Sequence, residues 1–110
     1  NIQVFADFLI IISYYESWLH GIEGRNDAAA SKILRLERKL RKTAIIRILK
    51  QLLPGMQKLL KTIKNACKLP LFAKQKRRLQ FVRLYNYLTA DEVWQKKGQL
   101  LIGWVKEQTQ

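Results

Sequence analysis

The sequence predicts an all-α fold, a compact bundle of about five helices in a single domain. Apolar residues recur every three or four positions along each segment, which is the spacing of one helix face. The composition favours straight-chain helix formers, and only 2 Pro and 5 Gly interrupt them. The sequence has no alternating apolar and polar run between turn residues, the pattern of a strand. A chain of 110 residues has room for one core, so we expect residues 1–110 to form one domain.

The first expected helix is Ile2–His20, in the very apolar segment 1–22. A membrane-spanning helix needs about 20 consecutive apolar residues. Asp7 and Glu16 interrupt this segment and leave only Phe8 to Tyr15 between them. A signal peptide would need a basic start and a small-residue cleavage site, and both are missing. We therefore expect a packed helix here rather than a membrane span or a signal peptide.

Glycine and proline divide the rest of the chain, residues 28–106, into further helices. Two glycines within residues 21–27 end the first helix, and Pro54 and Pro70 mark two later breaks. Thr89 is followed three residues later by Glu92, the spacing of a capping box at a helix start. The expected helices are Ala28–Leu53, Gly55–Lys68, Phe72–Leu88 and Ala90–Lys106.

The pattern within Ala28–Leu53 changes after Ala44. Ile46, Leu49 and Leu53 appear on the side that is basic earlier in the segment. The part of the segment after Ala44 is apolar on nearly every side of the expected helix. This indicates either burial at the centre of the bundle or an exposed patch that binds another protein. These three residues are therefore candidate protein contacts.

The apolar stripes of the expected helices also predict the core. Each stripe is opposite a polar or basic side of the same helix, so it is the side that should be buried. The side chains expected to be buried together are Phe5, Phe8, Ile12, Leu40, Leu59, Ile63, Val82, Tyr85, Leu101 and Trp104.

The sequence contains no recognisable catalytic or metal site. Cys67 and His20 are the only Cys and His, whereas a zinc site takes about four ligands. Cys67 lies on an apolar stripe, so we expect a core residue rather than a nucleophile. No glycine-rich phosphate loop is present. We expect a non-enzymatic protein without a metal or cofactor, and the single Cys favours a reducing, cytoplasmic location.

The distribution of charge is the most informative feature. The chain has a net charge of +13, and from Arg38 to Ala90 it contains 15 Lys or Arg and no Asp or Glu. A solvated helix usually alternates the sign of its charges. A stretch that accepts this much self-repulsion indicates an anionic partner.

The candidate nucleic-acid-binding residues come from three parts of this stretch and its margins. One is a ridge of lysines at helical spacing, formed by Lys58, Lys61, Lys64 and Lys68. The other two are short basic clusters, at Lys74–Arg78 and at Arg35–Lys42, and Arg83 follows the first of these clusters on the same helix. The set is Arg35, Arg38, Lys39, Lys42, Lys58, Lys61, Lys64, Lys68, Lys74, Lys76, Arg77, Arg78 and Arg83. Tyr87 shares a side of its expected helix with Lys76 and Arg83, so it is a candidate for stacking on an unpaired base.

We therefore expect a helical subunit that binds the DNA or RNA backbone with little sequence preference, together with other protein subunits in a larger ribonucleoprotein or protein–nucleic acid assembly. The small subunits of CRISPR effector complexes have this role. The comparison is only an analogy, because no sequence motif supports membership of that family. Lysine ridges opposite apolar stripes also suit an anionic membrane, as in bacteriocin-like proteins. An acidic protein partner fits the charge equally. Trp18, Trp94 and Trp104 fall on core stripes rather than beside the lysines, which favours nucleic acid over a membrane.

Overall fold

The structure, a computed structural model, describes residues 2–43 and 47–110. Within these ranges it contains six α-helices and no strand, which confirms the predicted all-α fold. The helices are α1 (Ile2–Leu19), α2 (Arg25–Thr43), α3 (Arg47–Lys68), α4 (Lys74–Thr89), α5 (Glu92–Lys97) and α6 (Gln99–Gln108).

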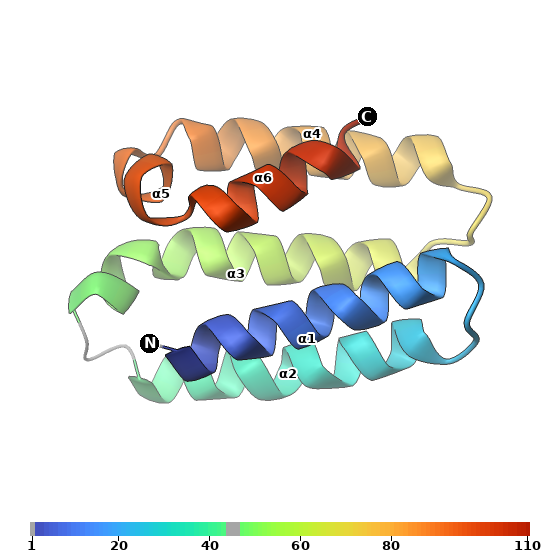
Figure 1. The fold of residues 1–110 in the computed structure, drawn as a ribbon, viewed down its shortest axis with the longest axis horizontal. Coiled ribbons are helices and arrows are strands. Elements are labelled where there is room, and N and C mark those ends of the chain that lie inside the picture. Colours follow the sequence, from blue (N-terminus) through green and yellow to red (C-terminus); the bar gives the residue numbers. More distant parts are fainter. Residues whose placement is uncertain (1, 44–46) are drawn as a thin grey trace.

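The five longer helices form two layers (Figure 1). Helices α2, α3 and α4 make the rear layer of that view, with α3 in the middle and in contact with both neighbours. In front of them, α1 packs mainly on α2, and α6 packs mainly on α4. The Cα extents of 40 × 26 × 17 Å fit a slab two helices thick, since packed helices lie about 8–10 Å apart. The rear layer thus has one side covered by helices and one outer side.

The core lies between the two layers, and buried side chains of all six helices belong to it. Aromatic rings connect the layers, because the ring centroid of Tyr15 on α1 lies 5.9 Å from that of Phe81 on α4. The same ring lies 5.9 Å from Trp104 on α6. The indole N–H of Trp104 donates to the carboxylate of Glu16 at 2.6 Å, which links α6 to α1.

Most of the predicted core residues are buried, namely Phe8, Ile12, Leu40, Leu59, Ile63, Leu101 and Trp104. The prediction for Phe5 is wrong: its side chain is 37% exposed, because the buried stripe of α1 passes through Val4 and Phe8. Val82 and Tyr85 are only partly buried. The buried side of α4 runs instead through Arg77, Phe81, Leu84 and Leu88, which places Val82 and Tyr85 on its flank.

The helix break expected at Pro54 is also wrong. Helix α2 ends at Thr43 and α3 begins at Arg47, so Pro54 lies inside α3. The change of pattern after Ala44 is the sequence signal of this boundary, because two helices with different orientations do not share one apolar side. The breaks expected at residues 21–27 and near Pro70 do separate helices.

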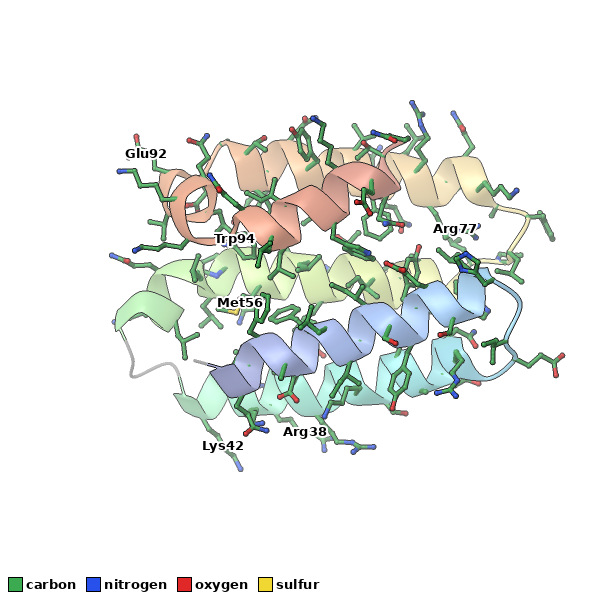
Figure 2. The ribbon with its side chains drawn as sticks, viewed as in Figure 1. Arg38, Lys42, Met56, Arg77, Glu92 and Trp94 are labelled. Atoms are coloured by element: carbon green, nitrogen blue, oxygen red, sulfur yellow. The ribbon has the colours of Figure 1, made fainter. Side chains whose placement is uncertain are left out.

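Gly55 serves the packing of α5 on α3. A Cβ atom on Gly55 would overlap the indole of Trp94, and a Cβ atom on Gly98 would overlap the same ring from the other side. Trp94, labelled in Figure 2, is almost completely buried, and its indole N–H donates to the carbonyl of Leu52 at 3.1 Å. Gly55 and Gly98 are therefore required because the indole of Trp94 lies too close to the backbone for a Cβ atom.

The last expected helix, Ala90–Lys106, is divided at Gly98 into α5 and α6. Its start differs from the predicted capping box, because Asp91 rather than Thr89 is the N-cap. The Asp91 carboxylate accepts from the backbone N–H groups of Val93 and Trp94 at 2.9 and 3.2 Å. The preceding helix begins at Lys74, two residues later than expected.

Asp7 connects α1 to α2 through two lysines. Its carboxylate is buried and lies 3.2 Å from the ammonium of Lys32 and 3.0 Å from that of Lys39. Burial alone would raise the pKa of Asp7, but the hydrogen bonds and charges of the two lysines together lower it below its usual value of 3.8. The ionised form is therefore the one that the folded state stabilises.

Gly55→Ala should destabilise the fold by about 1–3 kcal/mol, because the new methyl group overlaps the Trp94 indole. Gly103→Ala is the matched control: no atom lies within 4 Å of the Cβ position in α6, so alanine should raise stability by about 0.5–1 kcal/mol. Urea denaturation of the two variants measures both effects. Equal stability of the two variants would contradict the assigned role of Gly55.

Asp7→Asn should lower the free energy of unfolding by about 1–3 kcal/mol near neutral pH, because it removes a charged acceptor from two lysines. Since the folded pKa of Asp7 is lowered, its contribution is fully present above 3.8 and is lost as the pH falls below that value. The difference in stability between wild type and variant should therefore narrow at acid pH. A difference that stays constant would show that the charge of Asp7 is unimportant.

Candidate nucleic-acid interface

The outer side of α3 carries the predicted lysine ridge. Lys58, Lys61 and Lys68 are exposed, whereas Leu59 and Ile63 on the opposite side are fully buried. Side chains three or four residues apart lie on one side of a helix, and Lys58 and Lys68 are about 15 Å apart along the axis. The ridge therefore follows the C-terminal half of α3, the central helix of the rear layer.

Helix α4 adds a second row beside this ridge. Lys76, Gln80, Arg83 and Tyr87 follow one another at helical spacing on one side of α4. The ammonium of Lys58 lies 4.7 Å from the centroid of the Tyr87 ring, so the rows of α3 and α4 meet. Such a cation over an aromatic face is attracted by the negative charge density of the ring.

Helix α2 adds basic residues on the other side of α3. The ammonium of Lys64 lies 3.5 Å from the carboxylate of Glu37, which places this side of α2 next to the ridge. Arg41 is exposed one turn after Glu37. Arg38 and Lys42 point away from the body of the molecule along the outer edge of α2 (Figure 2). Arg35, one turn before Arg38, is exposed on the same edge.

We call this surface the basic face. It consists of the outer sides of α2, α3 and α4, continued by the edge of α2. Its basic residues are Arg41, Lys58, Lys61, Lys64, Lys68, Lys76 and Arg83, with Arg35, Arg38 and Lys42 at the edge.

The acids of the chain lie almost entirely elsewhere. Glu37 is the one acid that we locate on the basic face, and it is paired with Lys64. Asp7 is buried between α1 and α2, and Glu16 accepts from Trp104. The other acids lie in the α1–α2 loop or in the terminal turns of α2, α5 and α6, namely Glu23, Asp27, Asp91, Glu92 and Glu107. The imbalance along the sequence is thus also an imbalance across the molecule.

Two candidates have structural roles instead. Lys39 binds the buried carboxylate of Asp7. Arg77 is only 7% exposed, and its guanidinium donates to the carbonyls of Pro70 and Leu71 at 2.7 Å each. It also lies over the ring of Trp18, 5.7 Å from the centroid. Arg77 therefore holds the α3–α4 loop against the core, and its guanidinium is not available to a nucleic acid.

The sequence cluster Lys74–Arg78 is not a cluster in space. Consecutive residues of a helix are turned by about 100°, so Lys76 lies on the basic face while Arg77 is buried. Lys74 and Arg78 line a separate groove with Gln108 of α6, on the other side of α4. Of this cluster, only Lys76 joins the basic face.

The candidate protein contacts do not form an exposed patch. Leu49 is buried and Leu53 is partly buried against the core, because α3 is central in the bundle. Ile46 lies outside the described residues. Large exposed apolar side chains occur elsewhere, at Phe72 in the α3–α4 loop and Leu100 in α6, which are 86% and 76% exposed.

The sequence places Gln80 on the same side of its helix as Tyr87, but nothing in the sequence marks it as a binding residue. Its Oε1 atom is buried beside the basic face and has no hydrogen-bond partner among the described residues. The only sequence signal for this residue is its helical spacing from Lys76 and Arg83.

The alternatives to nucleic-acid binding are metal binding, chemistry at Cys67 or His20, and insertion into a membrane. Among them, no three His, Cys, Asp or Glu side chains lie close enough together to hold a metal ion. Cys67 is buried as expected, and burial raises the pKa of its thiol to about 11. His20 contacts the carbonyl of Glu16 at 2.8 Å in the turn that follows α1. No helix in ranges 2–43 and 47–110 combines the length and the apolar character that crossing a membrane requires.

Comparisons with known proteins give no match: no family model, no curated protein and no solved structure is significantly similar to this chain.

Proposed function

We propose that the basic face binds the phosphate backbone of DNA or RNA, as part of a non-enzymatic subunit of a larger assembly. The single observation that carries this proposal is the arrangement of the charges. Three adjacent helices together present ten lysines and arginines on one surface and its edge, and the one acid that we locate there is already paired.

Phosphate binding explains why such a surface would be maintained. Like charges at this density repel one another and destabilise the fold, unless an anion occupies the surface. Each phosphate neutralised by a Lys or Arg releases bound counterions, which makes binding strong at low salt and weak at high salt. The ridge on α3 is long enough to contact several successive phosphates. Backbone contacts carry no sequence information, so we expect little sequence preference.

Burial of the tryptophans favours nucleic acid over an anionic membrane. A helix that binds a membrane surface inserts apolar and aromatic side chains beside its lysines. Trp18, Trp94 and Trp104 are all buried in the core. Among the described residues, the centre of the basic face presents only one large aromatic side chain, Tyr87, and it lies against Lys58.

The exposed apolar residues support the proposal of an assembly. Phe72 and Leu100 are large side chains that a monomer would gain from burying. Neither belongs to the basic face, so other protein subunits and nucleic acid could occupy different parts of the surface. An acidic protein partner would use the basic face itself and is the competing interpretation of the same charges.

The triple variant Lys61→Gln, Lys68→Gln and Lys76→Gln should weaken binding to single- and double-stranded oligonucleotides alike. The slope of log affinity against log salt should flatten by about 2–3 in total, since each phosphate that is no longer neutralised accounts for about 0.7–0.9. Lys64 stays in place because it binds Glu37, and Lys58 because it contacts Tyr87. Fluorescence anisotropy at several salt concentrations measures both quantities.

The matched control is Lys96→Gln, Lys97→Gln and Lys106→Gln, which removes the same charge from exposed positions on α5 and α6. This control should retain most of the affinity and the slope. Equal losses in the two triple variants would mean that total charge, and not the basic face, causes binding. If wild type binds anionic vesicles or an acidic protein but no oligonucleotide, the proposal is rejected.

A further inference from the structure

A groove crosses the basic face between α3 and α4. It has a volume of about 240 Å³ and is lined by Lys58, Thr62 and Asn65 of α3 and by Gln80, Arg83 and Tyr87 of α4. Two of these residues are bases, and the other four carry a hydroxyl or amide group. The groove thus differs from the surrounding lysines in being concave and in combining charge with neutral polar groups and an aromatic ring.

Gln80 lines this groove, and its side chain carries a hydrogen-bond acceptor that is unused. The Oε1 atom of Gln80 is buried and has no partner among the described residues. The nearby hydroxyl of Thr62 donates to the carbonyl of Lys58 at 2.8 Å, so this donor is already engaged within α3. A buried acceptor without a donor costs free energy, and few such groups occur in folded proteins. A ligand that brings an N–H group into the groove would remove this cost once the partly exposed Gln80 side chain rotates Oε1 towards it.

The partly exposed aromatic ring of Tyr87 forms part of the groove wall. Tyr87 is 38% exposed, and the ammonium of Lys58 lies 4.7 Å from its centroid. Aromatic rings beside bases are the usual platforms for unpaired nucleobases, because every base has a flat face that can stack. Arg83 lies one turn before Tyr87 on α4, within reach of the same ligand.

We propose that this groove takes an unpaired nucleobase, so that the protein prefers single-stranded nucleic acid or an extruded base. This inference rests on the proposed function of the basic face and extends it. The base stacks on the Tyr87 ring in place of the Lys58 ammonium, and rotation of the partly exposed Gln80 side chain lets Oε1 accept an amino or imino N–H of the base. The flanking phosphates then contact Lys58 and Arg83. A base within an intact duplex cannot enter, because it is stacked and paired on the same edge.

The experiment compares two strands with the same phosphates, an oligo(dC) strand of about 12 nucleotides and an abasic strand of equal length. Wild type should bind oligo(dC) about tenfold more tightly than the abasic strand, the effect expected of one stacked base. Tyr87→Leu should remove most of this difference and leave the affinity for the abasic strand unchanged. Tyr87→Phe keeps the ring and should keep the difference.

Tyr14→Leu is the matched control for the ring. Tyr14 also has a cation over it, with the Arg25 guanidinium 5.4 Å from the centroid, but it lies on α1 outside the basic face. This variant should behave like wild type with both strands. Gln80→Leu tests the acceptor: the melting temperature should rise, because an unpaired buried oxygen is removed, while the preference for oligo(dC) falls severalfold.

Equal wild-type affinity for the two strands would overturn the inference. So would a Tyr87→Leu variant that loses affinity for both strands equally, since the ring would then only hold Lys58 in place. A Gln80→Leu variant that keeps the full preference would remove Gln80 from the site. In all three cases, a loss of binding in the Lys61, Lys68 and Lys76 variant would still support the basic face. No binding of either strand by wild type would reject both proposals.

Discussion

Burial of the apolar side of α3 is the constraint on which the rest of the structure depends. Leu59, Leu60 and Ile63 on this helix are fully buried, which requires α1 and α6 to cover the layer that α3 shares with α2 and α4. Once that side is covered, the lysines opposite it must face outward. The neighbours of α3 then place their own basic sides next to it. The basic face is thus a geometric consequence of how one amphipathic helix is buried.

The charges on this face oppose folding, and the structure offsets them with specific contacts. Lys64 is paired with Glu37, and the ammonium of Lys58 lies over the Tyr87 ring. Both contacts cross between helices, so they also hold the three-helix layer together. Exposed pairs of this kind contribute about 0–1 kcal/mol each. The remaining repulsion is consistent with a surface that is complete only when an anion is bound.

The sequence predicted the features that depend on helical periodicity and missed those that depend on contacts between helices. The ridge and buried stripe of α3 were predictable because Lys and Leu alternate at the helical period over several turns. The role of Gly55 was not, because the close approach of Trp94 from α5 is a tertiary contact. The buried side of α4 was predicted only in part for a related reason, since Val82 and Tyr85 lie on its flank. Its buried side includes Arg77, whose charge is satisfied by the carbonyls of Pro70 and Leu71 and by the ring of Trp18.

The same distinction separates the basic face from the groove within it. Charge is a property of each residue, so a run of bases without acids can be read directly from a sequence. A groove depends on which side chains two neighbouring helices bring together.

Thr62 and Asn65 of α3 are shorter than the lysines around them, and they line the groove together with Gln80 and Tyr87 of α4. Shorter side chains at this crossing leave room that longer ones would fill, and the amide oxygen of Gln80 is buried there without a donor from the described residues. A surface that binds only phosphates has no use for a buried acceptor, because a phosphate diester offers no proton at neutral pH. The proposed base offers an N–H group that this oxygen can accept once the Gln80 side chain turns into the groove.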